Sequence, residues 1–321
     1  MTTYSFISKF SPVIEKYMAF RTAVGYSTYH GKMLRRFDRY CFEFHPNADR
    51  LTKDVVKGWF DYEIAHGYTG LDQKSAAIRS FAKFVGGDAY MLPVDLIPKR
   101  PHFTPYILTD DELYRLFTAI DCFHKDDDPF LSKTLSVLFR LIYACGLRPN
   151  EGRNLQTSHI DFDSGELFIT KTKRRKERII VASDEMTDLL REYKIARDVI
   201  SSKDGYFFVR GNGEPLTAWY VTRYFKECWA AANPGISTQE LPRLRVYDLR
   251  HRFASAVLQQ WLDENKNLYA MLPYLRSYMG HVRFEDTAYY IHVLPDRLVK
   301  SPGINWEAID KTGLEEALWE H

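Results

Sequence analysis

The chain has 321 residues, 45% of them hydrophobic and 15% aromatic, so it has room for two domains and enough apolar side chains to exclude global disorder. Its 44 basic and 42 acidic residues leave a net charge of +2, so a polyanion-binding surface would have to come from local clusters. The four cysteines are widely spaced, and the sequence has neither a secretory signal nor an apolar run of membrane-spanning length. We therefore expect a soluble, cytoplasmic protein without disulfides, zinc or membrane contact.

The first 92 residues are predicted to form a small helical domain. Apolar side chains recur at helical spacing in four segments, with Ser11 and Thr52 as expected N-caps of the first and third helices and Ser27 as the start of the second. The basic face of the second helix contains Lys32, Arg35, Arg36 and Arg39. Such faces are usually only solvated; the alternative, for which we retain the three arginines as candidates, is contact with DNA.

A proline-rich segment follows at residues 93–106. It contains Pro93, Pro98, Pro101 and Pro105, which block helix continuation and keep a chain extended. We therefore interpret it as an interdomain linker and place the second domain at residues 107–321.

The second domain opens with two predicted helices. A Thr-Asp-Asp-Glu capping box at residues 109–112 starts the first, and the second ends at Gly146. Pro149 suits the first position of a further helix, so Arg148 would lie at a helix N-terminus, where exposed N–H groups favour an anion. The alternative is a surface arginine that closes a helix break.

Residues 160–182 are predicted to form a β-hairpin with an additional strand, and the connecting turn is the densest basic cluster of the chain. Its six cations are Lys171, Lys173, Arg174, Arg175, Lys176 and Arg178. Exposed turns are often charged, so solvation is one interpretation. Six like charges in eight residues repel one another unless a polyanion is close, and this favours DNA contact.

The remaining candidate residues lie on or beside three predicted helices in the C-terminal part of the chain. Asp248 is the expected N-cap of the first, and its first turn presents Arg250 and His251. The second helix ends just before His281, and Tyr290 falls on or beside the third.

These residue types suit an attack on a phosphodiester by a protein side chain. A phenol is a weak nucleophile at neutral pH and needs cations or a base beside it. Two arginines can bind the non-bridging oxygens with fork geometry, a lysine can protonate the leaving 5′ oxygen, and a histidine can donate a further hydrogen bond. The sequence has no convincing carboxylate cluster and no phosphate-binding glycine loop, so we expect no metal and no nucleotide cofactor.

In this order, the motifs resemble those of the tyrosine recombinase, or phage integrase, family over almost the whole chain. Gly-Leu-Arg-Pro-Asn-Glu at residues 146–151 is similar to the first-arginine motif, and Leu-Arg-His at residues 249–251 to the second. The basic turn resembles the motif of the catalytic lysine, with Lys173 the best match and Lys171 the alternative.

The last two motifs of the family also have counterparts. Gly-His at residues 280–281 resembles the final histidine motif, and Thr-Ala-Tyr-Tyr at residues 287–290 resembles the segment with the nucleophile. The family's usual spacing selects Tyr290 over Tyr289.

The resemblance implies a mainly helical fold with a small β-hairpin. Residues 1–92 would be a helical core-binding domain, and residues 107–321 a catalytic domain with a C-terminal tail helix. The implied protein is a bacterial, nucleoid-associated recombinase of the integrase or transposase type. It would bind double-stranded DNA at specific core sites and assemble as a tetramer, with the tail docking in cis or in trans.

The resemblance also implies a role for each site residue. Tyr290 would attack the scissile phosphate and form a 3′-phosphotyrosyl link, with Lys173 as general acid. The residues implied to stabilise the charged transition state are Arg148, Arg250 and His281. Those implied to support them are Glu151 and His251.

One position departs from the family pattern. The residue three positions before the second arginine is usually histidine, and here it is Tyr247. A tyrosine can hydrogen-bond a phosphate oxygen, but it is a poor base at neutral pH. The departure leaves the proton acceptor open, and two other functions remain as alternatives: a DNA-binding architectural protein with weak or no chemistry, and a type IB topoisomerase-like enzyme.

Overall fold

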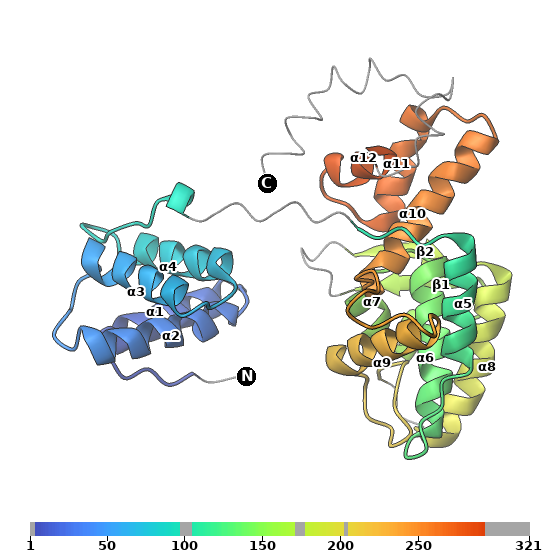
Figure 1. Ribbon diagram of the computed structural model, residues 1–321, viewed down its shortest axis with the longest axis horizontal. Coiled ribbons are helices and arrows are strands. Elements are labelled where there is room, and N and C mark those ends of the chain that lie inside the picture. Colours follow the sequence, from blue (N-terminus) through green and yellow to red (C-terminus); the bar gives the residue numbers. More distant parts are fainter. Residues whose placement is uncertain (1–3, 97–104, 171–176, 202–204, 293–321) are drawn as a thin grey trace. The chain divides into compact units, whose positions relative to one another are not determined.

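The computed structural model describes residues 4–96, 105–170, 177–201 and 205–292. The chain divides into two compact units, residues 1–103 and 104–321, and the division falls in the proline-rich segment. Figure 1 shows the helices of both units, and each unit has its own apolar core.

Unit 1 is helical. Its elements are α1 (Ser11–Ala23), α2 (Tyr29–Phe44), α3 (Lys53–Ala65), α4 (Leu71–Val85) and a short 3-10 turn at Val94–Leu96. The core side chains Phe37, Trp59 and Phe81 are fully buried. Thr52 caps α3 as expected, because its side chain accepts a hydrogen bond from the Val55 N–H.

Two predicted helix starts in unit 1 were wrong. The N-cap of α1 is Phe10 rather than Ser11, and α2 begins at Tyr29 after Thr28 rather than at Ser27. Neither observed cap residue makes a side-chain capping bond, although the Ser27 hydroxyl accepts a hydrogen bond from the N–H of Tyr29.

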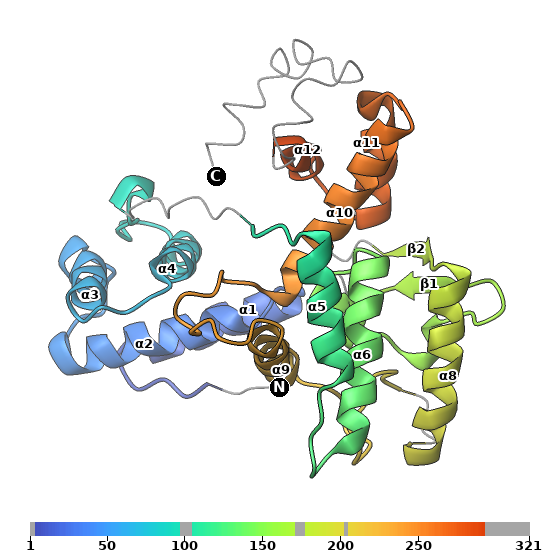
Figure 2. The same cartoon turned by 45° about the vertical axis from the view of Figure 1, so that its right-hand side comes forward.

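Unit 2 contains helices α5 to α12 and one small sheet. The helices are α5 (Asp110–Asp121), α6 (Pro129–Ala144), α7 (Pro149–Arg153), α8 (Asp184–Ile200), α9 (Ala218–Ala231), α10 (Val246–Asp263), α11 (Leu268–Met279) and α12 (Glu285–His292). Helix α6 packs against α5, α8 and α10, and its side chains Leu135, Leu138 and Phe139 are fully buried (Figure 2). Helices α10, α11 and α12 bury a second apolar cluster in unit 2. The partly buried Tyr278 packs against both clusters of this unit.

The sheet has two antiparallel strands, β1 (Glu166–Ile169) and β2 (Arg178–Val181), with Glu166 opposite Val181. The additional strand that the sequence predicts is only a single bridge between Ile160 and Leu167. The expected fold class, mainly helical with a small hairpin, is confirmed.

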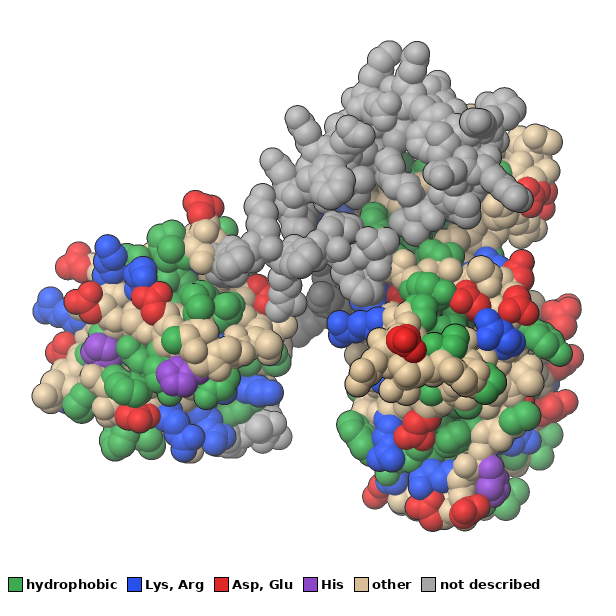
Figure 3. Space-filling view, in the orientation of Figure 1, with side chains coloured by type: hydrophobic (Ala, Val, Ile, Leu, Met, Phe, Trp, Pro, Cys, Tyr) green, Lys and Arg blue, Asp and Glu red, His purple; other side chains and the backbone are tan. Residues whose placement is uncertain are grey.

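Charge is distributed rather than concentrated on the surface that Figure 3 shows, where basic and acidic side chains alternate on both units. Within the described ranges, no helix is both long enough and apolar enough to cross a membrane.

Candidate active site

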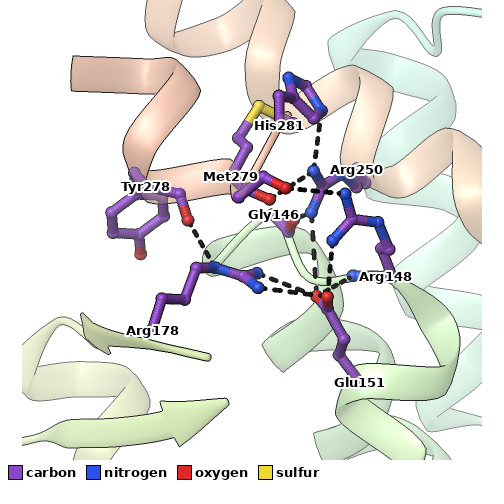
Figure 4. A network of polar contacts seen from close by, with 9 residues as sticks. Gly146, Arg148, Glu151, Arg178, Arg250, Tyr278, Met279 and His281 are labelled. Atoms are coloured by element: carbon purple, nitrogen blue, oxygen red, sulfur yellow. Dashed lines mark hydrogen bonds and ion pairs between the residues drawn. The ribbon is translucent and has the colours of Figure 1, made fainter. Parts of the chain in front are cut away.

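Glu151 is the centre of a buried ionic network in unit 2 (Figure 4). Its carboxylate accepts hydrogen bonds from both terminal nitrogens of Arg178, at 3.1 and 2.9 Å, and from Nη1 of Arg148 at 2.7 Å. The Nη1 atom of Arg250 lies 3.9 Å away. Burial alone would raise the pKa of Glu151, but the hydrogen bonds and charges of Arg178 and Arg148 hold it at about 2. A carboxylate that is ionised at neutral pH therefore holds three guanidinium groups close together.

The loop before α7 places Arg148 in this network. Gly146 ends α6 in the left-handed region with φ of 55°, and Arg148 is the N-cap residue of α7. The Nη2 atom of Arg148 donates to the Gly280 carbonyl at 3.0 Å, and its side chain is 24% exposed. It is the most exposed of the three arginines around Glu151.

Arg250 lies in the second turn of α10, rather than in the expected first turn, and is completely buried. Its Nη1 donates to the Gly146 carbonyl at 2.6 Å, and its Nη2 donates to the Met279 carbonyl at 2.7 Å. This single side chain thus connects the ends of α6 and α11. Burial lowers its pKa, but an arginine stays charged at neutral pH.

His281 follows the left-handed Gly280 that ends α11, and its side chain is buried. Its Nε2 lies 2.9 Å from Nη2 of Arg250, and its Nδ1 lies 2.8 Å from Oγ1 of Thr287. Because a guanidinium can only donate, Nε2 accepts and the ring hydrogen is on Nδ1, directed at Thr287. Burial, followed by the charge of Arg250, lowers the pKa of His281 to about 3, in agreement with a neutral ring.

Tyr290 lies on α12 against the same cluster and is 2% exposed. Its hydroxyl is 2.9 Å from Nδ1 of His251, and its ring stacks at 6.1 Å on that of His281. Burial raises the pKa of the Tyr290 phenol above its ordinary value, and the charge of Arg250 acts in the opposite direction. The adjacent Tyr289 is less buried.

Tyr247, the residue at the departing position, is half-buried at the edge of the site. Its ring centroid lies 5.0 Å from that of His251. Burial lowers the pKa of Arg148, but Glu151 and then the Tyr247 phenol outweigh this effect and raise it. Tyr247 is thus close enough to interact with the cations of the site.

The structure brings eight of the sequence-derived candidates into one cluster: Arg148, Glu151, Arg178, Tyr247, Arg250, His251, His281 and Tyr290. Lys171, Lys173, Arg174, Arg175 and Lys176 lie outside the described residues, as does the tail from residue 293. In unit 1, Arg35 and Arg39 are exposed, whereas Arg36 is paired with Glu63 at 3.1 Å.

Two expectations at the site require correction. Arg178, grouped with the DNA-contacting turn, is instead 8% exposed and bound to Glu151 and to the Tyr278 carbonyl at 2.8 Å. Asp248 is not the N-cap of α10: Arg245 is, and its backbone N–H donates to the Asp248 carboxylate at 2.7 Å. Sequence spacing could not reveal the Arg178–Glu151 pair, whose partners are 27 residues apart on different elements.

Comparison with known proteins assigns a family to this site. The model described as the phage integrase family matches residues 107–297. The Sinorhizobium fredii protein y4rE, which carries an integrase/recombinase name, is 29% identical over 292 residues, covering 87% of this chain and 90% of that protein. Tyrosine recombinase XerC of Halalkalibacterium halodurans is 27% identical over 248 residues, covering 74% and 75%.

A solved structure shares the fold. The integrase of transposon Tn1549, in complex with a circular intermediate DNA, matches with a TM-score of 0.63 at 15% identity, covering 87% of this chain and 94% of that chain. The chain belongs to the phage integrase family, since the family model spans more than half of it. It is a tyrosine recombinase whose function is site-specific DNA recombination.

Proposed function

We propose that this protein cuts and rejoins DNA strands through a covalent 3′-phosphotyrosyl intermediate in which Tyr290 is the nucleophile. The observation that carries the proposal is the convergence of Tyr290 with Arg148, Arg250 and His281, which come from four separate elements. A phenol beside fixed cations is what attack on a phosphodiester requires.

The arginines would stabilise the charge that builds up on the non-bridging oxygens. A guanidinium has donors in a fixed fork, and Arg148 and Arg250 are held by backbone carbonyls and by Glu151 before DNA arrives. Such prior organisation stabilises a transition state without reorganisation at the moment of reaction. His281 would hold Arg250 in place by accepting a hydrogen bond from it, and Tyr247 would support a phosphate oxygen.

Lys173 would be the general acid that protonates the leaving 5′ oxygen, with Lys171 as the alternative. The support is indirect: Arg178, two residues beyond the turn that carries these lysines, is anchored to Glu151. Strand β2 therefore starts beside the arginine cluster. The phosphotyrosyl bond conserves the energy of the phosphodiester, so rejoining would need neither ATP nor a metal.

The DNA would be double-stranded and carry specific core sites, on which four protomers would assemble in the bacterial cytoplasm. Unit 1 would contribute contacts to the DNA backbone from the exposed Arg35 and Arg39. Arg36 would instead stabilise unit 1, through its pair with Glu63 and its stacking at 4.1 Å on Tyr68. The basic turn and the C-terminal tail would serve DNA contact and assembly.

A nicked suicide substrate tests the chemistry. Cleavage releases a short fragment that carries the 5′ hydroxyl, and its loss prevents rejoining. The wild-type protein should become linked to the 3′ end of the cut strand. Tyr290→Phe should give no adduct, whereas Tyr289→Phe, the matched control, should retain it. Binding without an adduct in every substrate would instead favour an architectural protein on this scaffold.

A further inference from the structure

The hydrogen bond of Tyr290 identifies a candidate for the unassigned proton acceptor. The phenol hydroxyl lies 2.9 Å from Nδ1 of His251, which is one residue after Arg250 rather than three residues before it. Within the described residues, Tyr247 makes no such hydrogen bond to Tyr290; its ring packs against that of His251 instead, at 5.0 Å between centroids. His251, and not Tyr247, is therefore the residue that contacts the Tyr290 hydroxyl.

We infer that His251 is a catalytic residue that takes the proton of Tyr290 when the phenol attacks DNA. The inference rests on the proposed function and deepens it, since it supplies the base that Tyr247 cannot provide. It also gives His251 a direct contact with a reacting atom rather than a supporting role.

A carboxylate lies beside the other nitrogen of the ring. Nε2 of His251 faces Oδ1 of the fully buried Asp248 at 3.8 Å, which is too long for a hydrogen bond but close enough to favour a hydrogen on Nε2. With Nε2 protonated, the Nδ1 lone pair points at the phenol. Tyr290 and His251 thus have the hydrogen bond between nucleophile and base that other activated hydroxyl nucleophiles use, and a carboxylate lies on the far side of the base.

Burial and the neighbouring charges set the pKa of the His251 ring. Burial, and then the charges of Arg245 and Arg250, lower the pKa of His251 to about 3, so the ring is neutral and able to accept at pH 7. Asp248 is itself paired with Arg245 at 2.7 Å. A phosphodiester anion among the arginines would neutralise them and raise the basicity of His251 as the DNA enters.

The proton balance of both half-reactions closes on this pair. In cleavage, the bond between Oη of Tyr290 and phosphorus forms, the bond to the 5′ oxygen breaks, the phenol proton moves to Nδ1, and the general acid protonates the 5′ oxygen. In rejoining, the 5′ hydroxyl attacks phosphorus, its proton returns to that general acid, and His251 returns its proton to the departing phenolate.

The test compares single-turnover adduct formation in His251→Asn, Tyr247→Phe and wild type on the suicide substrate. The asparagine amide can keep the hydrogen bond to Tyr290 but cannot take a proton, so it separates positioning from base catalysis. We expect His251→Asn to slow adduct formation by roughly 100-fold or more, the usual effect of a general base. Tyr247→Phe should cost about tenfold or less, as expected for one hydrogen bond.

Two substitutions in the reactants provide readouts that a structural role would not change. Replacing Tyr290 with 3,5-difluorotyrosine lowers the phenol pKa and should restore much of the rate of His251→Asn. A 5′-bridging phosphorothiolate, whose leaving group needs no proton, should rescue Lys173→Ala but not His251→Asn. DNA affinity of each variant is the folding control, and His251→Gln replaces His251→Asn if the latter does not fold.

The outcomes distinguish failure of the proposed function from failure of the role of His251. A wild-type protein that forms no adduct overturns the proposed function. Adducts in the wild type and, at a rate within about threefold, in His251→Asn overturn only the role of His251, because a general base contributes far more than that. A larger loss in Tyr247→Phe than in His251→Asn would return the proton acceptor to the residue three positions before Arg250.

Discussion

Glu151 is the carboxylate around which the three arginines of the site are arranged. It is 7% exposed and holds the guanidinium groups of Arg148 and Arg178 directly, with that of Arg250 nearby. The sequence placed Glu151 correctly in the first turn of α7, but the identity of its partners depends on contacts across the fold. Arg178 looks like one more cation of a basic turn until the tertiary structure shows its carboxylate partner.

This carboxylate should make stability depend on pH. The folded-state pKa of about 2 lies below the ordinary 4.5, so the stabilisation is complete above pH 4.5 and is lost as pH falls toward 2. The shift corresponds to about 3 kcal/mol at neutral pH, of which about 2 kcal/mol should be lost by pH 3. Glu151→Gln should be less stable by about 3–5 kcal/mol at pH 6, because three cations lose their anion.

Urea unfolding of both proteins at pH 6 and pH 3 measures the effect. The difference in free energy of unfolding between wild type and Glu151→Gln should shrink at pH 3. An equal difference at both pH values would show that Glu151 is not the titrating group.

At the scale of elements, the site is built from helix ends. The sequence predicted these ends well where one residue determines them: Gly146 after α6, Gly280 after α11, and the capping box of α5. The prediction was wrong at α10. Asp248 is the third helical residue, and its carboxylate accepts a hydrogen bond from the backbone N–H of Arg245, which is the N-cap. Cap chemistry on a single sequence does not distinguish these two registers.

Gly146 should tolerate no side chain. Its φ is 55°, and a Cβ there would lie 2.4 Å from Cδ1 of Phe253. We expect Gly146→Ala to destabilise the protein by roughly 2–4 kcal/mol, from backbone strain and overlap together, and to displace the carbonyl that binds Arg250. Urea midpoints provide the measurement.

A matched control separates the two causes. Gly235 also has a positive φ, of 89°, but a Cβ there would meet nothing within 4 Å. Gly235→Ala should therefore carry only the backbone cost, of about 1–2 kcal/mol. Equal losses at the two positions would contradict the overlap with Phe253.

At the scale of the molecule, each apolar core draws its residues from one unit. The core of unit 1 runs from Phe10 to Leu92, and the clusters of unit 2 contain only residues beyond Thr104. The prolines of residues 93–106 predict a linker, and the division between the two units falls within that segment. The sequence could not identify which basic residues of unit 1 are available to DNA, because the Glu63 partner of Arg36 lies on another helix.

Residues 104–321 should fold without unit 1. The isolated fragment should unfold cooperatively in urea, because its cores are complete. It should also bind DNA with a shallower salt dependence, since Arg35 and Arg39 are lost and each phosphate contact contributes a slope of about 0.9. An unfolded fragment would contradict independent folding of residues 104–321. An unchanged slope would contradict DNA contacts from unit 1.

The most direct measurement of the central claim is the identity of the residue that remains attached to DNA. The suicide-substrate adduct is digested with nuclease and protease, and mass spectrometry locates the nucleotide stub on a peptide. We expect a stub bound through its 3′ phosphate to Tyr290 and none on Tyr289. A stub on any other residue would contradict it.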